Sequence, residues 1–158
     1  MNRLTLTLAA AALALLPGLA VAGPAEDAFL AKLGGHWKGS GKLTGAETGT
    51  VECALTVRQR SDGVNFAVKC DVPEFGQQNF SGVMGYNDAA GRYEARSPSG
   101  EITPGVKKGS SVVFEAKMRG VAEGVSVLTV SAPRIIVDST VRRPGGTADI
   151  KSHIELKR

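Results

Sequence analysis

Motifs that carry chemistry are scarce in this chain. It has no G-x-S-x-G nucleophile elbow, no glycine-rich phosphate loop with its lysine, no H-E-x-x-H zinc motif and no paired histidines, because His36 and His153 lie far apart. Serines and acidic residues are present, but their spacing groups no acid, base and nucleophile. The sequence therefore favours a binding protein over an enzyme, and it predicts no cofactor and no metal site.

Long apolar runs and clustered positive charge are also missing from most of the chain. After the first 22 residues no stretch approaches the roughly 20 predominantly apolar residues that a membrane span needs, so we expect no stable membrane insertion. The 19 lysines and arginines are dispersed among 15 acidic residues, and no aromatic stacking platform accompanies them. These absences argue against nucleic acid as a partner.

The first 22 residues have the pattern of a cleaved signal peptide. Asn2 and Arg3 form a short positive region, residues 4–16 are apolar, and Ala20-Val21-Ala22 matches the small-residue cleavage pattern. No cysteine lies near this point, so we expect no lipid anchor. The sequence thus predicts a periplasmic or secreted protein whose mature part, residues 23–158, is a single domain.

The only tryptophan, Trp37, lies in a stretch of alternate glycines and lysines, Gly34–Leu43. If this stretch is extended, its tryptophan and two of its glycines share one face and its lysines lie on the other. A glycine-rich strand that bends over a large aromatic side chain is what closure of a β-barrel requires.

Residues 24–33, just before this stretch, read as a short helix that ends at a Gly-Gly pair. Phe29, Leu30 and Leu33 lie on one face of it. Two placements are open for this helix: its apolar face covers one end of the barrel, or the helix lies loosely on the surface.

From Thr50 onward the hydrophobic pattern has a period of two, interrupted by turn residues about every ten positions, which is typical of an all-β meander. Because every connection is short, we predict an antiparallel up-and-down β-barrel and not a Greek-key sandwich. Including the tryptophan stretch, the predicted strands are 36–44, 50–58, 64–71, 78–86, 92–98, 101–107, 110–118, 124–132, 134–142 and 147–157.

The two cysteines are predicted to form a disulfide across neighbouring strands. A hairpin that turns at Ser61-Asp62-Gly63 places residues whose numbers sum to about 123 opposite each other, and Cys53 and Cys70 satisfy this condition. Opposed residues of an antiparallel pair are close enough to bridge, and an exported protein is in an oxidising compartment. A redox or metal-binding pair is the alternative, but the spacing is not that of a CxxC site.

Some inward positions are small or hydroxylated, and a barrel of ten strands is wide enough to hold a cavity. An interior lined in this way need not fill completely with side chains, so we predict that a cavity remains inside the barrel. For each predicted lining residue, packing in a filled core is the alternative role. The residues predicted to line the cavity are Trp37, Leu55, Phe66, Val68, Met84, Tyr93, Phe114 and Ile150.

The pattern G-x-W-x-G-x-G at Gly35–Gly41, after a short helix and before a meander, resembles the calycin superfamily of lipocalin-like barrels, most closely its nitrobindin-type ten-stranded branch. The resemblance implies a small apolar ligand inside the barrel. It also implies a minor alternative, haem binding through a late-strand histidine, for which His153 has a comparable place. Strand alternation, however, points His153 outward with Lys151 and Glu155, unless a β-bulge reverses it.

Two hypotheses concern the ends of the barrel. Alternating turns gather basic residues at one end, either as ordinary soluble turns or as a positive rim that guides an anionic amphiphile to the mouth. The gathered basic residues are Arg58, Arg60, Arg92, Lys107, Lys108 and Arg134.

The alternative function is a periplasmic inhibitor of a secreted protease or lysozyme, which would insert its extended start, 23–27, or the loop 72–78 with Phe75 at its centre. The sequence gives neither the ligand's identity nor the oligomeric state.

Overall fold

The computed structural model describes residues 23–118, 122–142, 145 and 149–158, so the predicted signal peptide and residues 147–148 lie outside it. It contains one helix and ten strands. They are α1 (Pro24–Leu33), β1 (Gly35–Gly45), β2 (Gly49–Arg60), β3 (Gly63–Val72), β4 (Gly76–Asn87), β5 (Arg92–Arg96), β6 (Ile102–Lys108), β7 (Ser111–Met118), β8 (Ala122–Ser131), β9 (Arg134–Arg142) and β10 (Ile150–Lys157).

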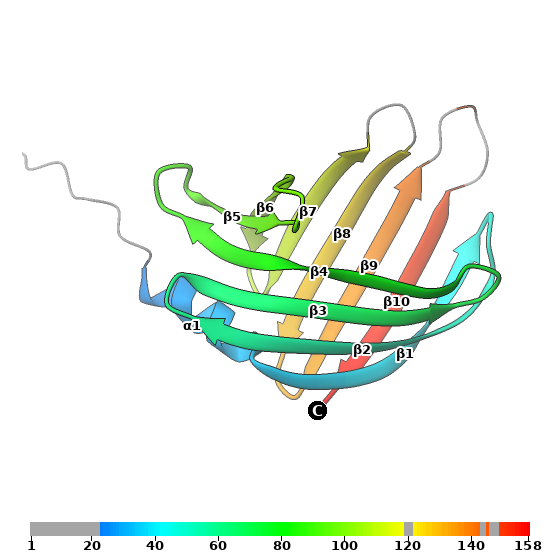
Figure 1. Cartoon of the computed structure of the whole chain (residues 1–158), viewed down its shortest axis with the longest axis horizontal. Coiled ribbons are helices and arrows are strands. Elements are labelled where there is room, and N and C mark those ends of the chain that lie inside the picture. The colour runs from blue at the N-terminus through cyan, green and yellow to red at the C-terminus, as the bar shows by residue number, and fades with distance from the viewer. Residues whose placement is uncertain (1–22, 119–121, 143–144, 146–148) are drawn as a thin grey trace, which may run out of the picture.

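Each strand pairs antiparallel with the next one in the sequence, and β10 pairs with β1 to close the barrel (Figure 1). The predicted up-and-down barrel is therefore confirmed. Strand β5 ends two residues earlier than predicted, because Ser97 already belongs to a turn: its backbone N–H donates to the Glu101 carbonyl oxygen at 2.9 Å.

Closure depends on glycines in β1. A Cβ atom at Gly39 or Gly41 would overlap the backbone carbonyl groups of Glu155 and His153 on β10. Glycine at these two positions lets the two strands approach closely enough to pair over Lys38–Gly45. This geometry agrees with the prediction that the stretch Gly34–Leu43 closes the barrel.

Helix α1 packs across one end of the barrel, which decides between its two predicted placements. Phe29, Leu30 and Leu33 are all buried, as their shared face requires. The Trp37 indole Nε1–H donates to the carbonyl oxygen of Leu33 at 2.8 Å, which ties the last turn of the helix to β1. Trp37 itself is 1% exposed.

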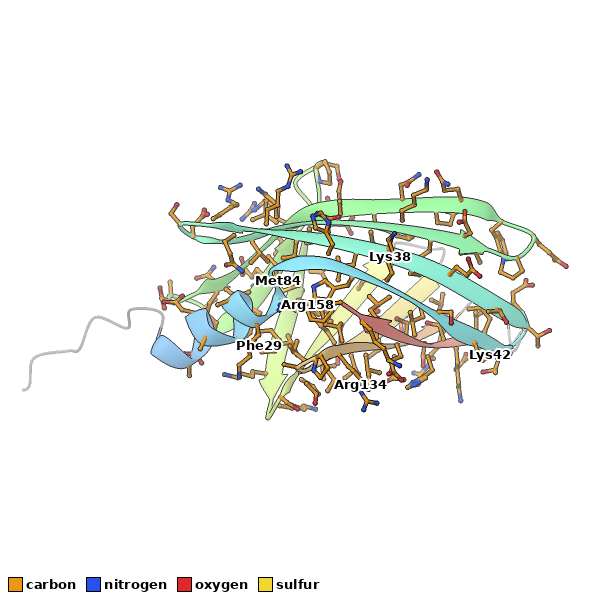
Figure 2. The ribbon with its side chains drawn as sticks, turned by 90° about the horizontal axis from the view of Figure 1, so that it is seen from below. Phe29, Lys38, Lys42, Met84, Arg134 and Arg158 are labelled. Atoms are coloured by element: carbon orange, nitrogen blue, oxygen red, sulfur yellow. A yellow bond between two sulfur atoms is a disulfide. The ribbon has the colours of Figure 1, made fainter. Side chains whose placement is uncertain are left out.

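Arg158, the last residue of the chain, packs over the same end of the barrel. Its guanidinium lies 4.3 Å from the centre of the Trp37 ring and donates to the carbonyl oxygens of Lys32 and Gly34 at 3.0 and 2.7 Å. These carbonyls lie at the negative end of the helix dipole, where a cation is favourable. In Figure 2, Arg158 lies beside α1, at the end that also holds Phe29.

The predicted disulfide is present. Cys53 on β2 is opposite Cys70 on β3, with their Cα atoms 4.2 Å apart and their sulfur atoms bonded. The pair is 17 residues apart in sequence, and both cysteines are buried on the inner face. Strand alternation therefore places Trp37, Cys53 and Phe66 together on the inner face of the barrel.

Candidate ligand-binding site

The interior of the barrel has two unlike halves. The first, which we call the packed half, lies against α1. It contains the largest fully buried side chains of the described residues, which are Trp37, Tyr93, Leu33, Ile135, Val64 and Val112.

The second, which we call the open half, lies toward the turn between β3 and β4. Its inward-facing residues are only partly buried, apart from Phe80, which is more exposed, and Val51, Cys53 and Cys70, which are buried even at this end. Solvent therefore reaches the inner face here. The open half comprises Leu43, Val68, Val72, Phe80, Gly124, Ser126, Ser139, Val141, Ile150 and Ser152.

Of the eight predicted lining residues, three are partly exposed to solvent and five are buried. Phe66, Val68 and Ile150 are partly exposed on the inner face. The other five are at most 9% exposed, so the structure places them in the core, in the role that was their alternative: Trp37, Leu55, Met84, Tyr93 and Phe114.

Phe80 is the most exposed residue of the open half, and it is not among the eight predicted lining residues. Alternation places it inside, opposite Val68, yet it is 58% exposed. The cause is the short β5, which pairs with β4 only from Val83 to Asn87, so β4 has no β5 neighbour beside Phe80 (Figure 1). Alternation marks Phe80 as inward, but the predicted strand 92–98 gave no sign that β5 is short.

The charged and titratable groups of the interior lie at the α1 end. Lys107 faces inward, 3.7 Å from the Glu26 carboxylate and 6.0 Å from the centre of the Phe29 ring. Burial, together with the nearby charges of Glu26 and Asp27 and with Tyr86, raises the pKa of the Tyr93 hydroxyl to about 12. These groups already have partners in the packed half.

The predicted basic end is the end that α1 covers, so it does not form a rim around an open mouth. Three of its four arginines are paired: Arg60 with Asp62 at 2.9 Å, Arg92 with Glu94 at 3.0 Å and Arg134 with Glu155 at 3.4 Å. Hydrogen bonding to Arg60 lowers the pKa of the Asp62 carboxyl. The steering of an anionic ligand by this rim is therefore not supported.

Both histidines face outward. His153 Nδ1 lies 2.6 Å from Asp138 Oδ1, and His36 Nδ1 lies 3.1 Å from the Thr56 hydroxyl. Strand β10 pairs with both neighbours from Ile150 to Lys157 without a bulge. The outward direction predicted for His153 is confirmed, and a haem ligated by His153 inside the barrel has no support in this geometry.

The two segments considered for insertion into a target enzyme belong to a helix and to a turn that connects two strands. Residues 24–27 are not extended but form the first turn of α1, where the Lys107 ammonium reaches the Ala25 carbonyl oxygen at 3.4 Å. The loop at Phe75 is a tight turn of three residues between Val72 and Gly76, although Phe75 is 50% exposed. The expectation of an extended start was wrong, because Pro24 begins the helix immediately.

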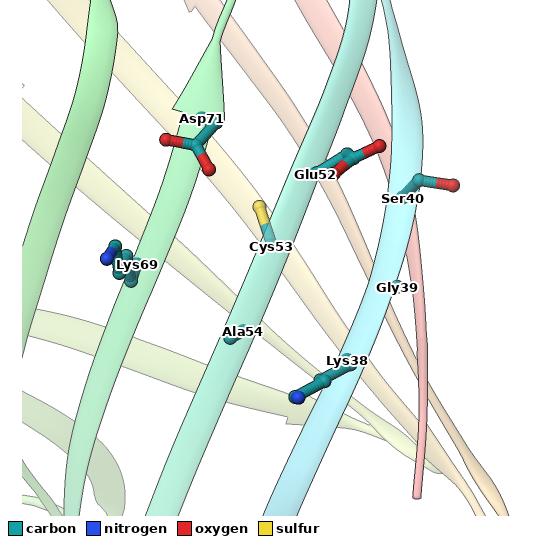
Figure 3. A pocket seen from close by; sticks show the side chains of 8 residues that line it. All are labelled: Lys38, Gly39, Ser40, Glu52, Cys53, Ala54, Lys69 and Asp71. Carbon is teal, nitrogen blue, oxygen red and sulfur yellow. The ribbon is translucent and has the colours of Figure 1, made fainter.

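A shallow depression of about 460 Å³ lies on the outer face of β1, β2 and β3 (Figure 3). Side chains of both charge signs border it, so its electrostatics favour neither an anion nor a cation. It also lies on the opposite side of the sheet from the open half. Its lining residues are Lys38, Gly39, Ser40, Glu52, Cys53, Ala54, Lys69 and Asp71.

No protein-family model matches this chain, and no curated protein matches it. Solved structures do. An S-type phycobiliprotein lyase from Guillardia theta shares 11% identity, with a TM-score of 0.65 over 84% of this chain and 91% of its own. The protein Rv2717c from M. tuberculosis shares 13% identity, with a TM-score of 0.57 over 86% and 98%.

A zebrafish ileal bile acid-binding protein solved with cholic acid also matches, at 12% identity over 80% of this chain and 99% of its own, but its TM-score of 0.41 supports no argument. The other two likenesses establish the fold. The shared architecture is an antiparallel β-barrel, the fold class that the sequence predicted. Among the described residues, no helix is long and apolar enough to cross a membrane.

Proposed function

We propose that this protein binds a small hydrophobic or amphipathic molecule in the open half of its barrel. One observation carries the proposal: apolar side chains that face inward there are exposed to solvent, most of all Phe80 at 58%. Exposed apolar surface inside a concave wall gains free energy when an apolar ligand covers it. Calycin-like barrels of low sequence identity support the fold that holds such a site.

We propose binding without catalysis. In the described part of the chain, the inward strand positions of the open half carry no titratable side chain apart from the disulfide-bonded cysteines. No group of three or more histidine, cysteine, aspartate or glutamate residues suited to a metal ion occurs among the described residues either. General acid–base and nucleophilic mechanisms need such groups at the ligand.

We also propose that the protein is exported. The signal-peptide pattern of residues 1–22 motivates this, and the Cys53–Cys70 disulfide is compatible with an oxidising compartment. N-terminal sequencing of the protein from a periplasmic or culture fraction should begin at Gly23. Recovery of the full-length chain from the cytoplasm alone would contradict export.

The binding proposal is tested by titrating the purified protein with Nile red, an uncharged hydrophobic dye. We expect saturable fluorescence enhancement, and native mass spectrometry should show a co-purified or added small molecule on the folded chain. Absence of both would contradict the proposal.

A matched pair of variants locates the site. Gly124 faces inward, and a Cβ atom there would meet only the Ala116 carbonyl oxygen, at 3.9 Å, so Gly124→Phe places a ring in the open half without a backbone clash. Val125, the next residue, faces outward, so Val125→Phe is the control. We expect Gly124→Phe to weaken Nile red binding at least about tenfold, while Val125→Phe leaves it unchanged. Equal effects would place the dye elsewhere.

A further inference from the structure

The open half contains a row of three serine hydroxyls on neighbouring strands. In the register, Ser126 on β8 is opposite Ser139 on β9, and Ser139 is opposite Ser152 on β10. All three serine side chains face inward, as do Leu128, Val137 and Ile154 on the same strands, which pack against the core. Side chains of directly opposed residues lie about 4.5–5.5 Å apart at Cβ, so one small ligand group can reach two neighbouring serines of the row.

This row has unused hydrogen-bonding capacity. The hydroxyls of Ser126 and Ser139 lie 2.9 Å apart and share one hydrogen bond. Each serine hydroxyl offers one donor and two acceptor positions, so this bond leaves a donor and several acceptors of the pair free. The Ser152 hydroxyl makes no hydrogen bond to any other described residue.

Charge is absent from the same surface. Among the described residues, no lysine, arginine, histidine or ionised carboxylate faces inward in the open half, and the inward Lys107 is held by Glu26 at the opposite end. A charged group bound beside the serine row would lose part of its hydration without gaining a counter-ion, which is unfavourable. A neutral polar group would lose little, because the serines replace its water.

From these observations we infer that the molecule bound in the open half is uncharged and carries a hydroxyl or carbonyl group that hydrogen-bonds to two neighbouring serines of the row Ser126, Ser139 and Ser152. This inference rests on the proposed function and sharpens it, because it excludes the anionic amphiphile that the basic residues suggested. It assigns the ligand to neutral lipids and related uncharged hydrophobes with one polar group.

Three probes of equal chain length test the inference: 1-octanol, octane and octanoate, each measured by displacement of Nile red at pH 8. We expect 1-octanol to bind more tightly than octane, by about two- to tenfold for each hydrogen bond gained, and octanoate to bind most weakly. In Ser126→Ala/Ser139→Ala/Ser152→Ala the advantage of 1-octanol over octane should disappear, while octane binds as before.

Ser111→Ala is the matched control. The hydroxyls of Ser111 on β7 and Thr129 on β8 also form a hydrogen bond, at 2.7 Å, but both side chains face outward. The control should keep the preference of the wild-type protein. Octanoate binding as tightly as 1-octanol, or a triple variant that keeps the alcohol preference, would overturn the inference while leaving the proposed function intact. Failure of Nile red and all three probes to bind would overturn both.

Discussion

The packed half and the open half are walled by the same ten strands but differ in what fills them. In the packed half, α1 adds Phe29, Leu30 and Leu33 to the inner side chains, and Trp37 and Arg158 fasten the helix in place. In the open half most inward side chains are only partly buried, and β4 lacks a β5 neighbour beside Phe80. The difference indicates that stability is concentrated at one end, which leaves the other end free to hold a ligand.

The strongest test of this comparison exchanges one aromatic residue in each half for alanine. Trp37→Ala should lower the free energy of unfolding by about 3–5 kcal/mol, because a fully buried ring and its hydrogen bond to Leu33 are lost. Phe80→Ala should cost less than about 1 kcal/mol, because that ring is 58% exposed. Urea unfolding followed by circular dichroism measures both. Similar costs would show that the halves contribute equally.

The disulfide links β2 to β3 on the inner face of the barrel. Cys53→Ala/Cys70→Ala should destabilise the protein by about 3 kcal/mol, because the unfolded chain regains the freedom of the closed loop. Wild-type protein unfolded in excess dithiothreitol is the control and should show a similar loss. A loss confined to the variant would indicate that cavities left by the two side chains, and not the missing cross-link, cause the effect.

Tyr93 makes the packed half sensitive to alkaline pH. Its folded pKa of about 12 exceeds the unfolded value near 10, so the unfolded chain releases the proton first. The contribution is fully present below pH 10 and is lost as the pH rises toward 12, amounting to about 2–3 kcal/mol. Tyr93→Phe should reduce this loss, whereas Tyr86→Phe should retain it. Urea unfolding at pH 9 and pH 11.5 measures the difference, and parallel curves for all three proteins would contradict the assignment.

The strands that form the wall of the barrel could be predicted from the sequence. Period-two alternation and short turns yielded all ten strands, because an antiparallel meander is encoded locally in hairpins. The position of the Cys53–Cys70 disulfide followed from one hairpin register, and the outward direction of His153 from one strand's parity. Each of these features depends on residues that are close in the sequence or on a single pairing.

The division of the interior was beyond the sequence, because it depends on where the helix packs and on which strands are short. Alternation marks Tyr93 and Phe80 alike as inward, but only the structure shows that α1 buries one and that the missing β5 neighbour exposes the other. The serine row was missed for a related reason: Ser126 and Ser139 are 13 residues apart, and only the shared register of β8 and β9 brings them together.

Two glycines on the inner face provide the smallest test of the comparison. Gly39→Ala should cost roughly 1–3 kcal/mol, because its Cβ atom would overlap the Glu155 carbonyl and force β1 and β10 apart. Gly124→Ala should be neutral or stabilise the protein by up to about 1 kcal/mol, because its Cβ atom enters free space in the open half and the unfolded chain loses freedom. Thermal unfolding of both variants measures the contrast. A cost for Gly124→Ala equal to that for Gly39→Ala would mean that the open half is as tightly packed as the seam.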